Sequence, residues 1–238
     1  MLNISRSEVE FARANGINIA YQTFGDKDAS PLILIMGLGS QMVLWDGEFC
    51  RQLAAGGYRV IRFDNRDIGL STKLDWMQVP DSAAVASALQ RGEVPALPYT
   101  LEDMAADTAE LLKALGYDWA HIVGESMGGM IGQIMAIHFP ERLRSLTSIM
   151  SSTGNPLLPP PSPEVLEILY TPFPPDHDGY VESFVRAFKI LSGPAMPLNE
   201  TLARKWAEQT YKRGLNPAGV ARQFAAIMAA GDRTEKLK

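Results

Sequence analysis

The chain has 238 residues, of which 46% are hydrophobic and 21% are charged, and its length suits one large α/β domain with a sizeable core. A formal net charge of −5 argues against a general binder of nucleic acids or of anionic membranes. The single cysteine, Cys50, excludes an internal disulfide and a thiolate metal cluster.

The first part of the chain predicts a β-hairpin followed by strands that alternate with helices. Residues 8–14 and 17–23 are expected to be strands joined at Asn15-Gly16, because both residues tolerate the positive φ of a type I′ turn. Continuous apolar runs then predict strands buried on both faces of a parallel sheet. These runs cover residues 32–36, 58–63 and 119–123, with a weaker one at 145–150.

The clearest predicted helix covers residues 101–115, where apolar side chains recur at helical spacing. Thr100 is placed to cap this helix, and Asp103 three residues later completes a capping-box pattern. Strands that alternate with helices favour a mostly parallel sheet with helices on both faces.

The character of the chain changes after residue 154. Eight of the 16 prolines lie between residues 155 and 175, which predicts a stiff connector and no packed element. Helical patterns follow, and Pro217 suits the first turn of the last of them. We expect an α/β core with six strands over 1–154, a Pro-rich linker and helical cap over 155–230, and the start of a return to the core over 231–238.

The strongest chemical signal is the motif Gly124-Glu125-Ser126-Met127-Gly128-Gly129, between the predicted strand 119–123 and a predicted helix at 130–138. A nucleophile elbow of the G-x-S-x-G type needs a strand, a tight turn and a helix in that order. Side chains at Gly124 and Gly128 would crowd the turn, and Ser126 is the candidate nucleophile at the positive end of the helix. The alternative is a glycine-rich turn with an ordinary serine.

A second segment agrees with this interpretation. Met36-Gly37-Leu38-Gly39 follows the buried strand 32–35, where enzymes with such an elbow place an oxyanion loop. The backbone N–H groups of Leu38 and Met127 are the candidate oxyanion hole. The alternative is that the two glycines form only a turn.

With these motifs the chain resembles the α/β-hydrolase superfamily, from Met36–Gly39 through Phe63–Ser71 to the elbow. The middle stretch resembles the superfamily's D-x-R-G-x-G-x-S segment, with Asp67 where glycine is usual. The resemblance implies a scaffolding role for Asp64, Arg66 and Ser71, with substrate contact as the alternative.

Within the superfamily the chain is most similar to the aclacinomycin methylesterase-like esterases, which act on anthracycline-type polyketide esters. This similarity includes Met36, where many relatives carry histidine, and residues 189–193 of the expected cap. It implies an α/β-hydrolase fold with a helical cap, and neither a metal nor an organic cofactor.

The resemblance also implies a catalytic acid after about the seventh strand and a histidine after the eighth, but neither strand is visible. His121 lies within the strand before the elbow, and His138 lies roughly 18 Å along the following helix. His177, on an expected cap loop, is the remaining alternative as a base. The acid and the histidine are therefore unassigned in this chain, and the fold is expected to lack its last two strands. Either the gene continues for roughly 50–65 further residues that supply them, or the chain is a shortened and impaired relative. The strand at 145–150 would then be an open edge that pairs with a partner or in a homodimer.

These observations predict a serine hydrolase that cleaves a small apolar carboxylic ester, including methyl esters, through an acyl-enzyme. The alternatives are a ligand-binding or interaction protein that has lost the base, and a cofactor-free perhydrolase. With no apolar signal segment and no apolar run long enough for a bilayer, we expect a cytoplasmic protein without membrane or nucleic-acid partners. Several cap side chains are expected to shape the ester pocket or else to form core: Phe184, Phe188, Trp206, Phe224 and Met228.

Overall fold

The computed structural model describes residues 4–238, which form two units. The first unit contains residues 4–155 and 216–238, and the second contains residues 156–215. The return to the core therefore begins at residue 216, not at the expected 231. The reason is that helix α8 (Pro217–Ala229) is tied to the first unit by buried polar contacts, which are described with the site below.

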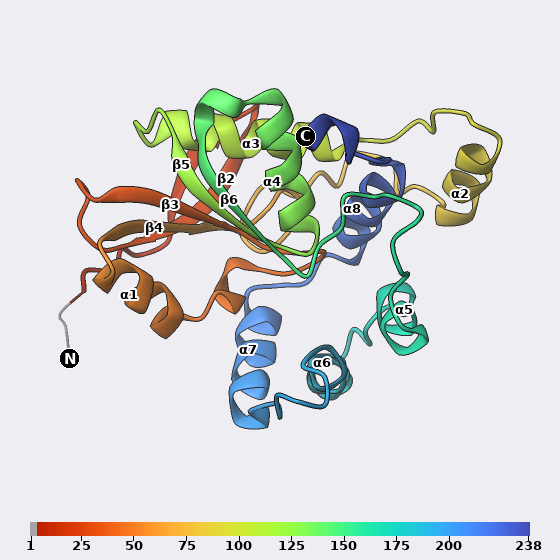
Figure 1. Cartoon of the computed structure of the whole chain (residues 1–238). Coiled ribbons are helices and arrows are strands. Elements are labelled where there is room, and N and C mark those ends of the chain that lie inside the picture. The colour runs from red at the N-terminus through yellow and green to blue at the C-terminus, as the bar shows by residue number, and fades with distance from the viewer. Residues whose placement is uncertain (1–3) are drawn as a thin grey trace. The chain divides into compact units, whose positions relative to one another are not determined.

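The first unit is built on a six-stranded sheet with the order β1-β2-β4-β3-β5-β6 (Figure 1). The β1–β2 and β2–β4 pairs are antiparallel, and the other pairs are parallel. Asn15 and Gly16 have φ angles of 46° and 82°, which confirms the predicted hairpin. The strands are β1 (Glu10–Ala14), β2 (Ile17–Phe24), β3 (Ser30–Ile35), β4 (Tyr58–Phe63), β5 (Ala120–Glu125) and β6 (Leu143–Ile149).

Strand β3 shows how the apolar pattern builds two layers. Ile33 and Ile35 belong to the core cluster shared with α3 (Leu101–Ala114) and α4 (Met127–His138). Leu32 and Leu34 belong to a second cluster that includes residues of α1 (Gly47–Ala55). Because successive strand side chains point to opposite faces, an unbroken apolar run serves both cores. Helices α3 and α4 thus cover one face of the sheet, and α1 covers the other (Figure 1).

The helix α3 begins at the predicted cap. The Thr100 hydroxyl accepts a hydrogen bond from the Asp103 amide, and the Asp103 carboxylate accepts one from the Thr100 amide. The first unit also contains α2 (Ser82–Gln90) and three 3₁₀ turns, at Met42–Leu44, Pro140–Arg142 and Glu235–Leu237. In the described part of the chain, no helix combines the length and the hydrophobicity that crossing a bilayer requires.

The second unit consists of the helices α5 (Pro163–Tyr170), α6 (His177–Leu191) and α7 (Glu200–Lys212). The helix α5 lies inside the Pro-rich stretch, so the expectation of a connector without packed elements is wrong there. Pro163 occupies the first helical turn, where its missing N–H costs nothing, and the Ser162 hydroxyl accepts a hydrogen bond from the Val165 amide.

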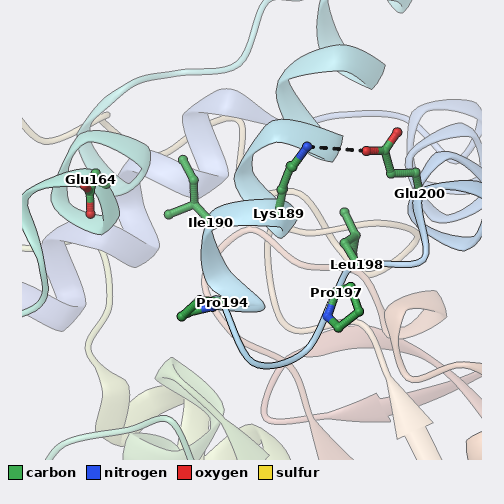
Figure 2. A pocket seen from close by; sticks show the side chains of 8 residues that line it. Glu164, Lys189, Ile190, Pro194, Pro197, Leu198 and Glu200 are labelled. Carbon is green, nitrogen blue, oxygen red and sulfur yellow. Dashed lines mark ion pairs between the residues drawn. The ribbon is translucent and has the colours of Figure 1, made fainter.

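Three of the aromatic residues expected around an ester pocket pack against one another inside the second unit. The Phe184 and Phe188 rings stack with their centroids 4.4 Å apart, and the Trp206 ring lies 5.9 Å from Phe188. An open pocket of about 580 Å³ in this unit is lined by other residues (Figure 2). They are Glu164, Lys189, Ile190, Gly193, Pro194, Pro197, Leu198 and Glu200.

Candidate active site

Ser126 lies at the junction of β5 and α4 in a strained backbone conformation. Its φ of 52° and ψ of −117° are unusual for a residue with a side chain. Hydrogen bonds on both sides hold this conformation. The Ser126 amide donates to the Ile149 carbonyl at 2.9 Å, and the Ser126 carbonyl accepts from the amides of Gly129 and Met130. Ser126 therefore stands on a sharp turn at the N-terminus of a helix, where partial positive charge favours an anion.

The glycines on either side of Ser126 have no room for a side chain. A Cβ atom at Gly124 would lie 2.2 Å from the Gly128 carbonyl oxygen. A Cβ atom at Gly128 would lie 2.2 Å from the Ile35 carbonyl oxygen and 2.9 Å from that of Met36. Glycine at both positions thus lets the end of β5 lie directly against the first turn of α4, and lets that turn lie directly against the end of β3.

The loop after β3 closes over the same turn. A Cβ atom at Gly37 would lie 3.2 Å from the Ser126 Cβ, so this loop touches the serine. Within residues 4–238, neither the Leu38 amide nor the Met127 amide donates a hydrogen bond to another group of the protein. Ser126 is half-buried, and two free N–H groups near its hydroxyl can stabilise negative charge on a reacting carbonyl oxygen.

The segment after β4 holds the loop in place. The Asn65 side-chain amide donates to the Met36 carbonyl at 3.0 Å. The Asp64 carboxylate is fully buried and accepts from the Met42 amide at 2.7 Å and from the Leu70 amide at 2.9 Å. Asp64 thus joins the loop after β3 to the loop after β4 through hydrogen bonds within the protein.

Arg66 and Ser71 are also occupied by contacts within the first unit. The Arg66 guanidinium makes two hydrogen bonds of 2.6 Å to the Asp107 carboxylate and lies over the Tyr99 ring. The Ser71 hydroxyl donates to the Asp64 carbonyl at 2.6 Å. These contacts favour the scaffolding interpretation of Asp64, Arg66 and Ser71 over substrate contact.

Asp67, where glycine is usual, has a φ of 70° and a buried partner. Its carboxylate accepts hydrogen bonds of 2.8 and 2.9 Å from the Arg222 guanidinium of α8. Both side chains are at most 1% exposed. The Leu74 amide donates to the same carboxylate at 2.7 Å. Sequence reasoning missed this ion pair, and the only signal that pointed toward it was the departure from glycine at position 67.

The contacts of Gln223, the next residue of α8, were also not predicted from the sequence. Its Oε1 accepts a hydrogen bond from the Gly39 amide at 2.9 Å, and its Nε2 donates to the Arg66 carbonyl at 2.9 Å. Its side chain is fully buried. One side chain of α8 therefore bridges the loop after β3 and the loop after β4.

Glu125, directly before the serine, is a largely buried acid. Burial raises the pKa of its carboxyl group. A Cβ atom at Gly37 would lie 3.7 Å from Glu125 Oε1, so the carboxyl group borders the loop after β3. Within residues 4–238 no cluster of three His, Cys, Asp or Glu side chains is arranged to hold a metal ion.

Neither histidine of the first unit is hydrogen-bonded to Ser126. His121 Nδ1 lies 2.7 Å from the Ser145 hydroxyl. His138 is the last residue of α4. His177, in the second unit, is held by the carboxylates of Asp178 and Glu208, and these hydrogen bonds raise its pKa. In the described residues, no side chain forms a hydrogen bond with the Ser126 hydroxyl, so the acid and the histidine of a triad stay unassigned.

Comparisons with known proteins agree with this geometry. A family model described as "alpha/beta hydrolase fold" matches residues 30–217. Rhodomycin D methylesterase DnrP from Streptomyces peucetius is 31% identical over 220 residues, which cover 84% of this chain. The chain spans only 65% of the length of that curated relative.

Solved structures show the same fold. A hydrolase from Pseudomonas aeruginosa PA01 superposes with a TM-score of 0.62 at 24% identity, covering 96% of this chain and 75% of its own. The enol-lactonase from Burkholderia xenovorans LB400 superposes with a TM-score of 0.63 at 21% identity, covering 96% of this chain and 78% of its own.

Proposed function

Because the chain belongs to the α/β-hydrolase family, we propose that it cleaves a carboxylic ester with Ser126 as the nucleophile. One observation carries the proposal: Ser126 is held at a φ of 52° on a strand–turn–helix junction that the loop after β3 touches. Strain of this kind persists only where the surrounding structure enforces it, and it is typical of reactive sites.

The chemistry follows from the groups around Ser126. Its hydroxyl oxygen attacks the ester carbonyl carbon, while the electron pair of the C=O bond moves to the oxygen. The amides of Leu38 and Met127 bind that oxyanion, and the N-terminus of α4 adds a favourable field. Collapse of the tetrahedral intermediate expels the alcohol and leaves an acyl-enzyme, which water hydrolyses. A base must accept the serine proton, and in the first unit no side chain is hydrogen-bonded to the Ser126 hydroxyl.

One other function is compatible with the same turn. A protein with the same fold and an intact elbow, but no base, would bind an ester or acid ligand without turning it over. The observation that fits it is that, within the first unit, the Ser126 hydroxyl has no hydrogen-bonded histidine.

For the substrate, we propose a small apolar ester that includes methyl esters. The support is the 31% identity to a protein named as a rhodomycin D methylesterase. Hydrolysis rates with methyl and longer alkyl esters of one aromatic acid test this choice, because a methylesterase prefers the smallest alcohol.

A fluorophosphonate probe tests the nucleophile directly. Wild type, Ser126→Ala and the matched control Ser148→Ala are treated with the probe, and the modified peptide is located by mass spectrometry. Labelling that is kept in Ser148→Ala and lost in Ser126→Ala supports the proposal. Absence of labelling in all three proteins favours the binding protein, and labelling that survives in Ser126→Ala refutes the assignment.

Two further predictions about the whole protein remain. The cytoplasmic location stays a prediction from the sequence. The strand β6 lies at one edge of the sheet in the described part of the chain, where it can pair with a second copy. Light scattering tests the homodimer, and a monomer would contradict it.

A further inference from the structure

We propose that Gln223 is a positioning residue for the oxyanion hole, and that the Asp67–Arg222 ion pair fixes it there. The proposal rests on the proposed ester hydrolysis for its kinetic consequence, but not for the hydrogen bonds themselves. It adds a residue from the far end of the chain to a site otherwise made by the loop after β3 and the elbow.

The hydrogen bonds of Gln223 allow only one orientation of its side-chain amide. The Gly39 backbone offers a donor, and the Arg66 backbone offers an acceptor. A flipped amide would place donor against donor and acceptor against acceptor. Because the side chain is fully buried, water cannot replace either bond. Gln223 therefore fixes the direction of the Gly39 N–H group.

Fixing Gly39 also fixes its neighbour. Gly39 has a φ of 65°, and a Cβ atom there would lie 3.0 Å from a methyl group of Val220, so α8 packs directly against this residue. The Gly39 amide donates to Gln223, whereas the adjacent Leu38 amide makes no hydrogen bond within residues 4–238. Each oxyanion donor must lie within a few tenths of an ångström of its productive position. Gln223 provides this precision without touching the substrate.

The ion pair anchors the helix that carries Gln223. Arg222 is bound through two nitrogens to Asp67, and Arg222 Nη1 also donates to the Met77 carbonyl at 3.2 Å. The Asn216 side chain, at the start of α8, donates to the Asp67 carbonyl at 2.8 Å. Asp67 therefore receives hydrogen bonds from α8 itself and from the residue that precedes it, and sets where the helix, and with it Gln223, lies on the loop after β4.

The test uses the variants Gln223→Met and Gln223→Glu in the full chain. Methionine keeps the length of the side chain and removes both bonds, whereas glutamate can still accept from Gly39 but repels the Arg66 carbonyl. The matched control is Gln22→Met. Gln22 is equally buried, accepts from Arg62 at 3.1 Å and donates to the Ser7 carbonyl at 2.8 Å, and it lies on β2.

Two readouts are compared among these proteins: the NMR resonances and hydrogen exchange of the Leu38 and Gly39 amides, and the hydrolysis of p-nitrophenyl acetate. In Gln223→Met we expect both amide resonances to shift, Gly39 exchange to rise at least about 10-fold, and kcat to fall about 10- to 100-fold with little change in KM. This loss is smaller than that for removing an oxyanion donor outright. Gln223→Glu should recover part of the rate, and Gln22→Met should change neither readout.

The outcomes separate this inference from the proposed function. A wild type without Ser126-dependent hydrolysis would refute the proposed function, and the amide readout would then decide the positioning role alone. Unchanged Leu38 and Gly39 resonances in Gln223→Met would overturn the inference, as would a loss of kcat equal to that of Gln22→Met. A change in KM without a change in kcat would also overturn it.

Discussion

Replacing Asp67 with glycine is expected to destabilise the protein. The φ of 70° suits glycine, so the substitution relieves about 1 kcal/mol of backbone strain. It also leaves the Arg222 guanidinium buried without its carboxylate, which costs about 3–5 kcal/mol. The Leu74 amide loses its acceptor as well. The net effect is a loss of about 2–4 kcal/mol, because the unpaired charge outweighs the relieved strain.

The assay is equilibrium urea unfolding followed by circular dichroism for four proteins: wild type, Asp67→Gly, Arg222→Met and the double variant. Each single variant leaves one buried charge, that of Arg222 or of Asp67, without its partner. The double variant leaves neither, so it should be more stable than either single variant. The coupling energy of this cycle measures the pair. If Asp67→Gly is as stable as wild type, or if the two substitutions are additive, the buried pair does not hold α8 in the way described.

Three other predictions concern the elbow and the second unit. Gly128→Ala should lower stability by about 3 kcal/mol in thermal unfolding, because its Cβ would lie 2.2 Å from a backbone oxygen. Gly47→Ala, with only a flexible arginine end nearby, is the control, and equal melting temperatures would contradict the argument. Glu125→Gln should raise the urea midpoint at pH 7, because burial raises the Glu125 pKa and penalises the charged form in the folded protein. The difference should vanish at about pH 4, where the wild-type carboxyl group is protonated. For His177, whose pKa is raised by Glu208 and Asp178, the stabilisation is present below an unfolded pKa of about 6.5 and is lost as the pH rises through the folded pKa. His177→Asn should therefore lower the melting temperature more at pH 6 than at pH 9, and an equal effect at both would count against the cluster.

The parts of the fold that local sequence decides could be predicted. The turn at Asn15-Gly16, the run in β3 and the strand–turn–helix order around Ser126 follow from local sequence patterns, and each is present in the structure. Composition alone was a poorer guide. The prolines after residue 155 suggested a connector, yet Pro163 stands in a first helical turn, the one helical position that accepts proline freely.

The support of the candidate site could not be predicted from such patterns. Arg222 and Asp67 are 155 residues apart, and Gln223 and Gly39 are 184 residues apart. The spacing of residues along an apolar helix does not show which distant residue a buried arginine or glutamine contacts. The aspartate at position 67, in place of the usual glycine, was the one sign in the sequence of a charge in this loop. Its partner Arg222 can be identified only from the packing of α8 against the loop.

The return of the chain at residue 216 makes the second unit an insertion of roughly 60 residues within the first. Chain closure across such an insertion becomes costlier only with the logarithm of its length, so doubling or halving it changes the closure free energy by about 0.6 kcal/mol. The contacts of α8 with the loops after β3 and β4 are strong enough to absorb that difference. Insertions of different length can therefore be accommodated at this point of the chain while the contacts of α8 keep the loop after β3 in place.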